Sequence, residues 1–255
     1  MNDLAPPLKR RTSGAARGRG PRIDAQPGFV LHSYPWRESS LIIEVFTHGH
    51  GRVALVARGA KRPTSQFRGL LSSFSPLLLS WSGRNDIKTL VRADWTGGLP
   101  LLRGDALLAA FYLNELLVRL LARGDAHEQL FASYLEALRA LATDGTDHES
   151  TLRGFELDLL RETGHAPSFD VCADGAPVEA AGLYRVEATR GLERVESADG
   201  DIVVDGDTAL AIARRDFSAP QVATAGKSVL RHLLRVQLNG QPLNTRRILR
   251  DLREL

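Results

Sequence analysis

The sequence predicts an α+β protein: an N-terminal five-stranded β-barrel, then a mainly α-helical C-terminal domain that carries a small loop or hairpin insertion. Two observations lead to this prediction. Apolar residues alternate with period two between residues 28 and 95, and from Arg103 onward they recur with the period of helices. Because 255 residues are enough for two domains, we expect one at residues 26–102 and another at 103–255.

Five short strands make up the predicted barrel. Residues 29–34 and 41–46 alternate in hydrophobicity, and a glycine-containing turn then leads to a third alternating segment at residues 52–57. Two further strands are expected at residues 77–81 and 86–95. Five strands in about 70 residues are typical of the OB-type barrel, a recurrent oligonucleotide-binding architecture.

The helical domain begins with three predicted helices. Leucines and aromatic residues cover nearly the whole circumference of residues 107–121, which predicts a buried helix. Asp125 followed by Glu128 resembles a capping box at the start of a second helix. A third helix at residues 152–160 is expected to end before Gly164.

The remainder of the domain alternates between loop-like and helical patterns. Residues 165–206 are rich in glycine, aspartate and alanine, which predicts a loop or small hairpin module. We expect β-prone pieces at 183–187, 192–196 and 202–204, followed by helices from Asp207 to about Arg214, from Gln221 to Leu238 and from Thr245 to the end.

Charge is distributed unevenly along the chain. Residues 1–22 carry a net charge of +5, residues 23–105 of +4, residues 106–213 of −12 and residues 214–255 of +6. We therefore expect a polyanion to meet the two basic ends. Residues 1–25 offer little apolar surface to bury and are predicted to be a disordered basic arm, which either attracts phosphates or is a solvated tail.

Composition argues against several classes of protein. Cys172 is the single cysteine, so no intramolecular disulfide can form, and no apolar run approaches the roughly 20 residues of a membrane helix. We expect a soluble protein of a reducing cytoplasm, without a secretory signal. Neither a Gly-x-Ser-x-Gly elbow nor a nucleophile paired with histidine is visible, so an enzyme is not expected.

Residues 226–228 read Gly-Lys-Ser, as at the end of a phosphate-binding P-loop. The first glycine of that motif would fall at Gln221, so a nucleotide site is not predicted. Read as a helix, the segment places Lys227, Arg231 and Arg235 on one face, a candidate partner-binding surface that could also be a solvated basic face. The last helix repeats the arrangement with Arg246, Arg247, Arg250 and Arg253.

Candidate metal ligands are few. His48, His50 and Cys172 do not supply the four ligands at paired spacings that a structural zinc site requires. A cluster of aspartates lacks the spacing and the final glutamate of a calcium loop, which favours turn formation instead. These aspartates are Asp199, Asp201, Asp205 and Asp207.

Basic side chains of the barrel are the candidate DNA-binding residues. Single-strand binders use such cations to follow phosphates and aromatic rings to stack on bases. Tyr34, Trp36 and Phe67 lie near the cations in sequence, although core packing is the alternative for Trp36 and Phe67, and a barrel that binds protein instead of DNA is the alternative for the whole surface. The candidate cations are Arg37, Arg52, Arg58, Lys61, Arg62, Arg68, Arg84, Lys88 and Arg92.

The barrel segments carry a family likeness. FVLHSYPWRESSLIIEVFTHGHGRVALVARGAKRP, FRGLLSSFSPLLLSWSGR and IKTLVRADW resemble the N-terminal domain of the bacterial RecO recombination-mediator family, and GKSVLRHLLRVQLNGQPLNTRRIL resembles its C-terminal helices. The motifs E-S-S, F-T-x-x-x-G-R and A-R-G-A-K-R occur in order. The likeness covers roughly residues 26–255.

This resemblance implies a function. It implies binding to single- and double-stranded DNA, annealing of complementary strands, and work with RecR in RecF-pathway repair in the bacterial cytoplasm, at the nucleoid. It also implies contact with the acidic tail of the single-stranded DNA-binding protein (SSB), for which Lys227, Arg231 and Arg235 are the candidate residues, and help in loading RecA.

Many members of the family carry a zinc module built from two Cys-x-x-Cys pairs. Here only Cys172 of the first pair is present, and Leu183-Tyr184-Arg185 stands near the place of the second. We therefore expect residues 165–206 to be a degenerate module without zinc, and we expect no other cofactor.

Overall fold

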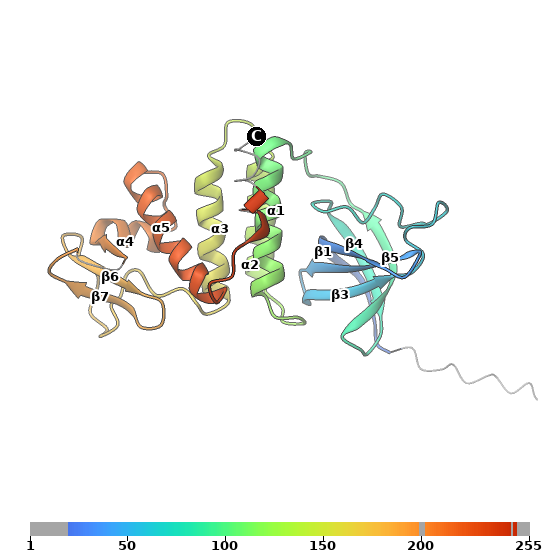
Figure 1. Ribbon diagram of the computed structural model, residues 1–255, viewed down its shortest axis with the longest axis horizontal. Helices are drawn as coiled ribbons and strands as arrows, with labels where there is room; N and C mark the ends of the chain where they lie inside the picture. Colours follow the sequence, from blue (N-terminus) through green and yellow to red (C-terminus); the bar gives the residue numbers. More distant parts are fainter. Residues whose placement is uncertain (1–19, 199–201, 246, 249–255) are drawn as a thin grey trace, which may run out of the picture.

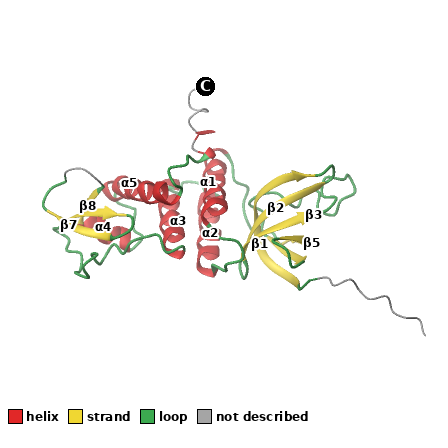
Figure 2. Cartoon of the chain, turned by 60° about the horizontal axis from the view of Figure 1, so that its bottom comes forward, coloured by secondary structure: helices red, strands yellow, loops and turns green. Residues whose placement is uncertain are grey.

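The computed structural model describes residues 20–198, 202–245 and 247–248. Three parts lie in a row: a β-barrel, a group of three helices, and a small sheet accompanied by two further helices (Figure 1). The barrel and the small sheet lie at opposite ends of the molecule, with helices between them (Figures 1 and 2).

The N-terminal part is a closed five-stranded barrel, as the sequence predicted. Its strands follow the order β1-β2-β3-β5-β4, and every neighbouring pair is antiparallel except β3 with β5. Ile43, Leu55, Leu79 and Trp81 fill the barrel. The strands are β1 (Arg22–Trp36), β2 (Ser40–Thr47), β3 (Gly51–Ala57), β4 (Leu77–Ser82) and β5 (Ile87–Trp95).

Strand β1 is longer than the sequence predicted. It begins at Arg22, which pairs with Ser82 of β4, so residues 22–25 belong to the barrel and not to a disordered arm. An irregularity between Ile23 and Gln26, with Ala25 at a φ of 51°, interrupts the alternation that would have shown this strand. Residues 1–19 of the predicted arm lie outside the described residues.

Three long helices follow the barrel and bury one another. Leu113 and Leu117 of the first, Leu138 of the second, and Phe155 and Leu159 of the third belong to one cluster of buried side chains. The helices are α1 (Gly104–Leu120), α2 (Glu128–Leu141) and α3 (His148–Glu162). Their order and period confirm the prediction for this part of the chain.

The predicted capping box at the start of α2 is wrong. His127 is the N-cap residue and makes no side-chain cap hydrogen bond. Asp125 lies in the preceding loop, where its carbonyl oxygen approaches Gly51 of the barrel so closely that a Cβ there would lie 1.7 Å away. The loop is therefore shaped by its contact with the barrel. A side-chain cap is found instead at α3, where the Asp147 carboxylate accepts from the Glu149 amide at 2.9 Å.

The predicted insertion is a regular three-stranded sheet of order β7-β6-β8. Residues 226–228 lie inside a helix, where Gly226 packs against Phe217, and this confirms the helical interpretation. Of the last predicted helix, Arg246 and residues 249–255 lie outside the described residues, including Arg250 and Arg253. The elements are β6 (Leu183–Glu187), β7 (Gly191–Val195), β8 (Val203–Asp205), α4 (Gly206–Ala213) and α5 (Pro220–Gln237).

Residues 165–206, the region predicted to be a degenerate zinc module, have an apolar interior. Cys172 is buried beside Phe169, Tyr184 and Leu192 in the main cluster, and burial raises the pKa of its thiol. The hydroxyl of Tyr184 accepts a hydrogen bond from the Glu179 amide at 2.8 Å. Within the described ranges, no three or more His, Cys, Asp or Glu side chains lie together as a metal site.

The other candidate metal ligands have structural partners. His48 packs edge-on against Phe131 and His50 against Trp81, at centroid distances of 5.5 and 5.4 Å. Asp205 caps α4 by accepting from the Thr208 amide at 2.7 Å. Asp199 and Asp201 lie outside the described residues.

The barrel and the helices share one hydrophobic core. Phe29 and Phe46 of the barrel belong to the same cluster as Phe131 and Tyr134 of α2. Buried polar groups join it, since Tyr134 donates to the Asn114 side chain at 2.6 Å, and burial raises the pKa of Tyr134. Because this core crosses the boundary between the two parts, their mutual orientation is held by packing. Among the described residues, no helix combines the length and hydrophobicity needed to span a membrane.

Candidate nucleic-acid interface

The outer face of strands β1, β2 and β3 is the surface on which the predicted cations meet. Residues directly opposite one another in antiparallel strands point to the same side of a sheet. Tyr34, Ile42 and Val56 are such partners, whereas the neighbouring Ile43 and Leu55 fill the barrel. We call the side that carries Tyr34, Ile42 and Val56 the outer sheet face.

One end of the outer sheet face is covered by the helices. Phe46 is fully buried there, with its ring 5.4 Å from Phe131 and 6.0 Å from Tyr134. The turn at Gly51, which has a φ of 58°, lies directly against the loop between α1 and α2. We call this region the covered end.

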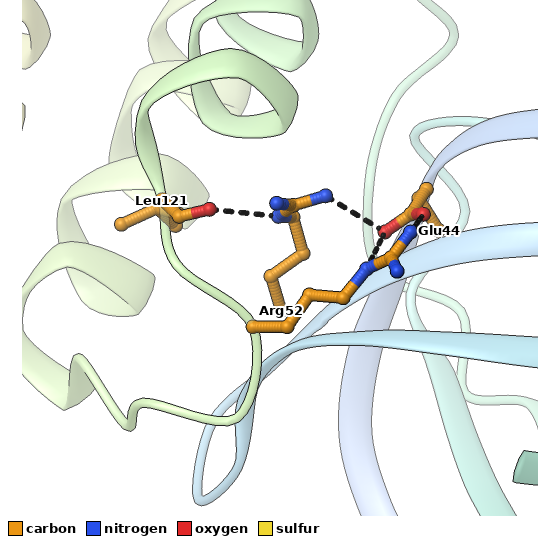
Figure 3. A network of polar contacts seen from close by, with 4 residues as sticks. Glu44, Arg52 and Leu121 are labelled. Carbon is orange, nitrogen blue, oxygen red and sulfur yellow. Dashed lines mark hydrogen bonds and ion pairs between the residues drawn. The ribbon is translucent and has the colours of Figure 1, made fainter. Parts of the chain in front are cut away.

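Glu44 carries a buried charge at the covered end. The Arg52 guanidinium donates to Glu44 at 3.0 Å and, through Nε, to the carbonyl oxygen of Leu121 at 2.9 Å (Figure 3). Arg123 pairs with the same carboxylate from the helical side, and its hydrogen bond to Glu44 raises the pKa of its guanidinium. A buried carboxylate requires such compensation.

The contacts of Arg52 conflict with its predicted role. Its side chain is only 15% exposed, and its Nη1 and Nε atoms donate to Glu44 and to the carbonyl of Leu121. Contact with DNA would have to break these bonds, so Arg52 attaches the barrel to the helices. Sequence reasoning missed Glu44, although a lone charge within the apolar run of β2 was a signal for a buried partner.

The other end of the outer sheet face, which we call the open end, forms a groove of about 870 Å³. Its apolar surface comes from Ile42 and Val56, together with Ile87 at the start of β5. The ring of Trp36, which is 45% exposed, lies along it. Three of the predicted cations line the groove, namely Arg37, Arg58 and Arg62.

Two turns place these cations together. Arg37 occupies the β1–β2 turn at a φ of 54°, with its guanidinium carbon 6.0 Å from the centre of the Trp36 ring. The turn after β3 is hydrogen-bonded to the β1–β2 turn, because the Lys61 amide donates to the Ser39 carbonyl at 2.9 Å. Arg37, Arg58 and Arg62 are exposed, and none of them forms an ion pair with another residue in the described part of the chain.

The remaining predicted cations lie outside this groove. Lys61, Arg68 and Arg84 are exposed on loops of the barrel, and Lys88 is half-buried at the start of β5. Arg92 pairs with Asp94 at 2.6 Å, and this hydrogen bond raises the pKa of Arg92. The structure therefore gathers three of the nine predicted cations in one groove.

The aromatic candidates also differ in their exposure to solvent. Phe67 is buried in the barrel core, which confirms the packing alternative and removes it as a stacking residue. Trp36 is exposed in the groove, and Tyr34 is 44% exposed on the same strand. Sequence reasoning missed the apolar floor of Ile42, Val56 and Ile87, which only the register of the strands reveals.

The candidate partner-binding residues lie on α5. Arg231 and Arg235 line a groove of about 500 Å³ whose apolar wall is formed by Leu234, Leu238 and Leu243. Arg247 adds a further cation to it. Lys227 is exposed on the same helix, but it pairs with Glu149 at 2.7 Å and does not line the groove.

Two family models match the chain. The model described as "Recombination protein O N terminal" matches residues 24–99, and that described as "Recombination protein O C terminal" matches residues 101–247. The chain belongs to the RecO family. This confirms the resemblance found in the sequence motifs.

Curated relatives in the RecO family cover nearly the whole chain. DNA repair protein RecO of Ralstonia nicotianae is 52% identical over 236 residues, which are 92% of this chain and 86% of the relative. The proteins of the same name from Aromatoleum aromaticum and Dechloromonas aromatica are 50% and 46% identical, over 92% of this chain and 98% of each relative.

Proposed function

We propose that this chain is a DNA-binding recombination mediator that holds nucleic-acid backbones in the groove at the open end. The observation that carries the proposal is the set of three exposed arginines, without ionic partners among the described residues, around an apolar floor. OB barrels bind oligonucleotides on the face of strands 2 and 3, where this groove lies. Membership of the RecO family, whose curated relatives are named DNA repair proteins, supports the same reading.

The proposed activity is annealing of complementary strands, and it needs no catalytic residue. Two DNA strands repel each other, and a surface of fixed guanidinium groups reduces that repulsion while base pairing selects the partner strand. Arginine suits this task because its planar fork can hold a phosphate with two hydrogen bonds. Since contacts to the backbone carry no sequence information, single- and double-stranded DNA of any sequence should bind.

We also infer that the groove beside α5 binds a protein partner. The acidic C-terminal tail of SSB would place its carboxylates on Arg231 and Arg235 and its terminal apolar side chain against Leu234, Leu238 and Leu243. Through this contact, and together with RecR, the protein would help to load RecA onto SSB-coated DNA in RecF-pathway repair.

Titration with an SSB tail peptide tests this docking site. Arg231→Ala combined with Arg235→Ala should weaken binding about tenfold or more, because hydrogen bonds between charged groups contribute about 1.5–3 kcal/mol. Lys227→Ala is the matched control on the same helix and should have a much smaller effect, since Lys227 lies outside the groove. Equal affinity of the double variant and the unchanged chain would remove this site.

DNA binding itself is tested with a labelled single-stranded oligonucleotide. Three phosphate contacts predict a slope of about −2 for log K against log salt, so the affinity should fall about 20-fold between roughly 50 and 200 mM salt. The alternative is a protein-interaction adaptor whose barrel binds protein, and the apolar floor formed by Ile42 and Val56 would also suit such a partner. No binding at about 50 mM salt would favour the adaptor.

A further inference from the structure

The last residues of β1 carry rings at alternate positions. The pairing of β1 with β4 ends at Gly28, and the strand continues to Trp36 beside α1. His32, Tyr34 and Trp36 are all exposed along this stretch, and the rings of His32 and Tyr34 meet edge-on at 4.4 Å. Because side chains two positions apart in a strand share a side, these rings form one row.

This row connects two grooves. Trp36 lines the groove at the open end, whereas His32 and Tyr34 line a second groove of about 690 Å³ between β1 and α1. Phe111, which is 41% exposed, lines the second groove from the side of α1. Ile248, which is 47% exposed, lines it from the C-terminal segment. The two grooves are thus adjacent, with only Pro35 of the same strand between Tyr34 and Trp36.

The two grooves differ in charge. In the first, Arg37, Arg58 and Arg62 are free to contact phosphates and outnumber its one carboxylate, that of Glu38. In the second, Arg119 and Glu115 pair with each other at 3.1 Å, so their charges compensate. The first groove therefore suits a phosphate backbone, and the second offers rings and apolar side chains that suit bases.

We propose that a single strand of nucleic acid passes from the open end along His32, Tyr34 and Trp36 into the second groove, where a base stacks on Tyr34 and faces Phe111. This inference rests on the proposed function and adds a path and a preferred form of the ligand to it. Every base has a π-face, so stacking of this kind tolerates any sequence.

Spacing favours a single strand over a duplex. Alternate residues of a β-strand are about 6.6 Å apart, whereas the bases of a duplex strand repeat about every 3.4 Å. The strand positions of Tyr34 and Trp36 therefore match the bases of an extended, unstacked strand, whereas the rings of His32 and Tyr34 meet at 4.4 Å and leave no room for a base between them. Stacked bases of a duplex are too closely spaced to contact Trp36 and Tyr34 in turn, so duplex DNA would use only the cations of the first groove.

Three ligands separate base stacking from phosphate binding: a single-stranded oligonucleotide of about 12 residues, the same strand built from abasic sites, and a duplex of equal length. With the full chain, Tyr34→Leu should weaken binding of the base-bearing strand about 5- to 100-fold. Phe111→Leu should act in the same direction. Binding of the abasic strand and of the duplex should change less than about twofold, because neither presents an unstacked base.

Trp95→Leu is the matched control, since Trp95 is 65% exposed at the far end of β5 and lines neither groove. It should leave all three affinities unchanged. The inference is overturned if Tyr34→Leu has no effect on the base-bearing strand, or if it weakens the abasic strand equally.

The proposed function is tested separately by Arg58→Ala combined with Arg62→Ala. If these replacements weaken all three ligands while Tyr34→Leu has no effect, only the second groove is rejected. If the arginine replacements leave every affinity unchanged, the groove at the open end is rejected as well.

Discussion

The two ends of the outer sheet face use the same kinds of residue for opposite purposes. At the covered end an aromatic residue and an arginine lie against the helices, where Phe46 is buried and Arg52 is half-buried. At the open end another such pair, Arg58 and Trp36, lines an exposed groove. This comparison shows that the position of the helices decides which cations remain available to a ligand. Neither the type of residue nor the strand that carries it decides this.

The energetic cost of burying a charge explains why the arginines of the two ends have different roles. At the covered end, the Glu44 side chain is only 3% exposed, and Arg52 and Arg123 compensate its charge from two sides. Breaking this group would leave a buried charge. Exposed cations contribute little to folding, so the arginines of the open end can be kept for a partner without much effect on stability.

The largest expected effect comes from the two aromatic residues of the face. Phe46→Ala should lower the free energy of unfolding by about 3–5 kcal/mol, because it leaves a cavity in the core shared by barrel and helices. Trp36→Ala should lower it by less than about 1 kcal/mol. Urea unfolding of both variants measures this contrast, and similar losses would contradict the distinction between the two ends.

A second contrast compares two glutamates of the same hairpin. Glu44→Ala should cost about 2–4 kcal/mol of unfolding free energy, somewhat less than for a fully buried ion pair, since Arg123 is 45% exposed and can be hydrated again. Glu38→Ala, at the exposed β1–β2 turn, should stay within about 0.5 kcal/mol. Thermal unfolding of the two variants under identical conditions should rank them in this order; the reverse order would show that the Glu44 cluster does not hold the covered end.

A smaller effect is expected at Glu115, which holds the C-terminal segment beside the second groove. Burial alone would raise the pKa of Glu115, but hydrogen bonds from Thr245 and Asn244 outweigh it, and the pKa lies below its ordinary value. A lowered pKa means that the carboxylate stabilises the fold above its unfolded pKa of about 4.3, and that this contribution is lost as the pH falls through the folded value.

Glu115→Gln should therefore cost about 1 kcal/mol at pH 7. The difference from the unchanged chain should shrink as the pH falls below about 4.3 and should disappear once the pH is below the lowered folded pKa, where the carboxylate is protonated in both states. Unfolding free energies measured from pH 7 down to pH 3 check this prediction. A difference that stays constant over that range would show that the charge of Glu115 is not responsible.

Much of the fold could be predicted from local pattern. Period-two alternation revealed the barrel strands, and the change to helical period revealed α1 to α3, because each element buries one face or one stripe. The start of β1 could not be predicted, since the irregularity at Ala25 hides its alternation. The capping box at Asp125 failed because the loop before α2 is fixed by its contact with Gly51, far away in sequence.

The candidate site was predictable in part. Arg37, Arg58 and Arg62 were found because exposed cations follow strand ends and turns in a visible pattern. Arg52 was assigned to the same group, but its guanidinium is engaged by Glu44 and by the carbonyl of Leu121, 69 residues away. Contacts between residues so far apart in the chain leave no signal in the local sequence pattern. For the same reason, the second groove between β1 and α1 could not be predicted.

The assignment of DNA binding to the open end is tested most directly with two variants. For each variant, both the rate of strand annealing and the free energy of unfolding are measured. Arg58→Ala combined with Arg62→Ala should slow annealing of complementary oligonucleotides about tenfold or more at about 100 mM salt. Its unfolding free energy should stay within about 1 kcal/mol of the unchanged chain. Arg52→Ala should show the opposite, a clear loss of stability with nearly unchanged annealing at a temperature where it remains folded. Unchanged annealing by the Arg58/Arg62 variant, or slowed annealing by folded Arg52→Ala, would contradict the assignment of DNA binding to the open end.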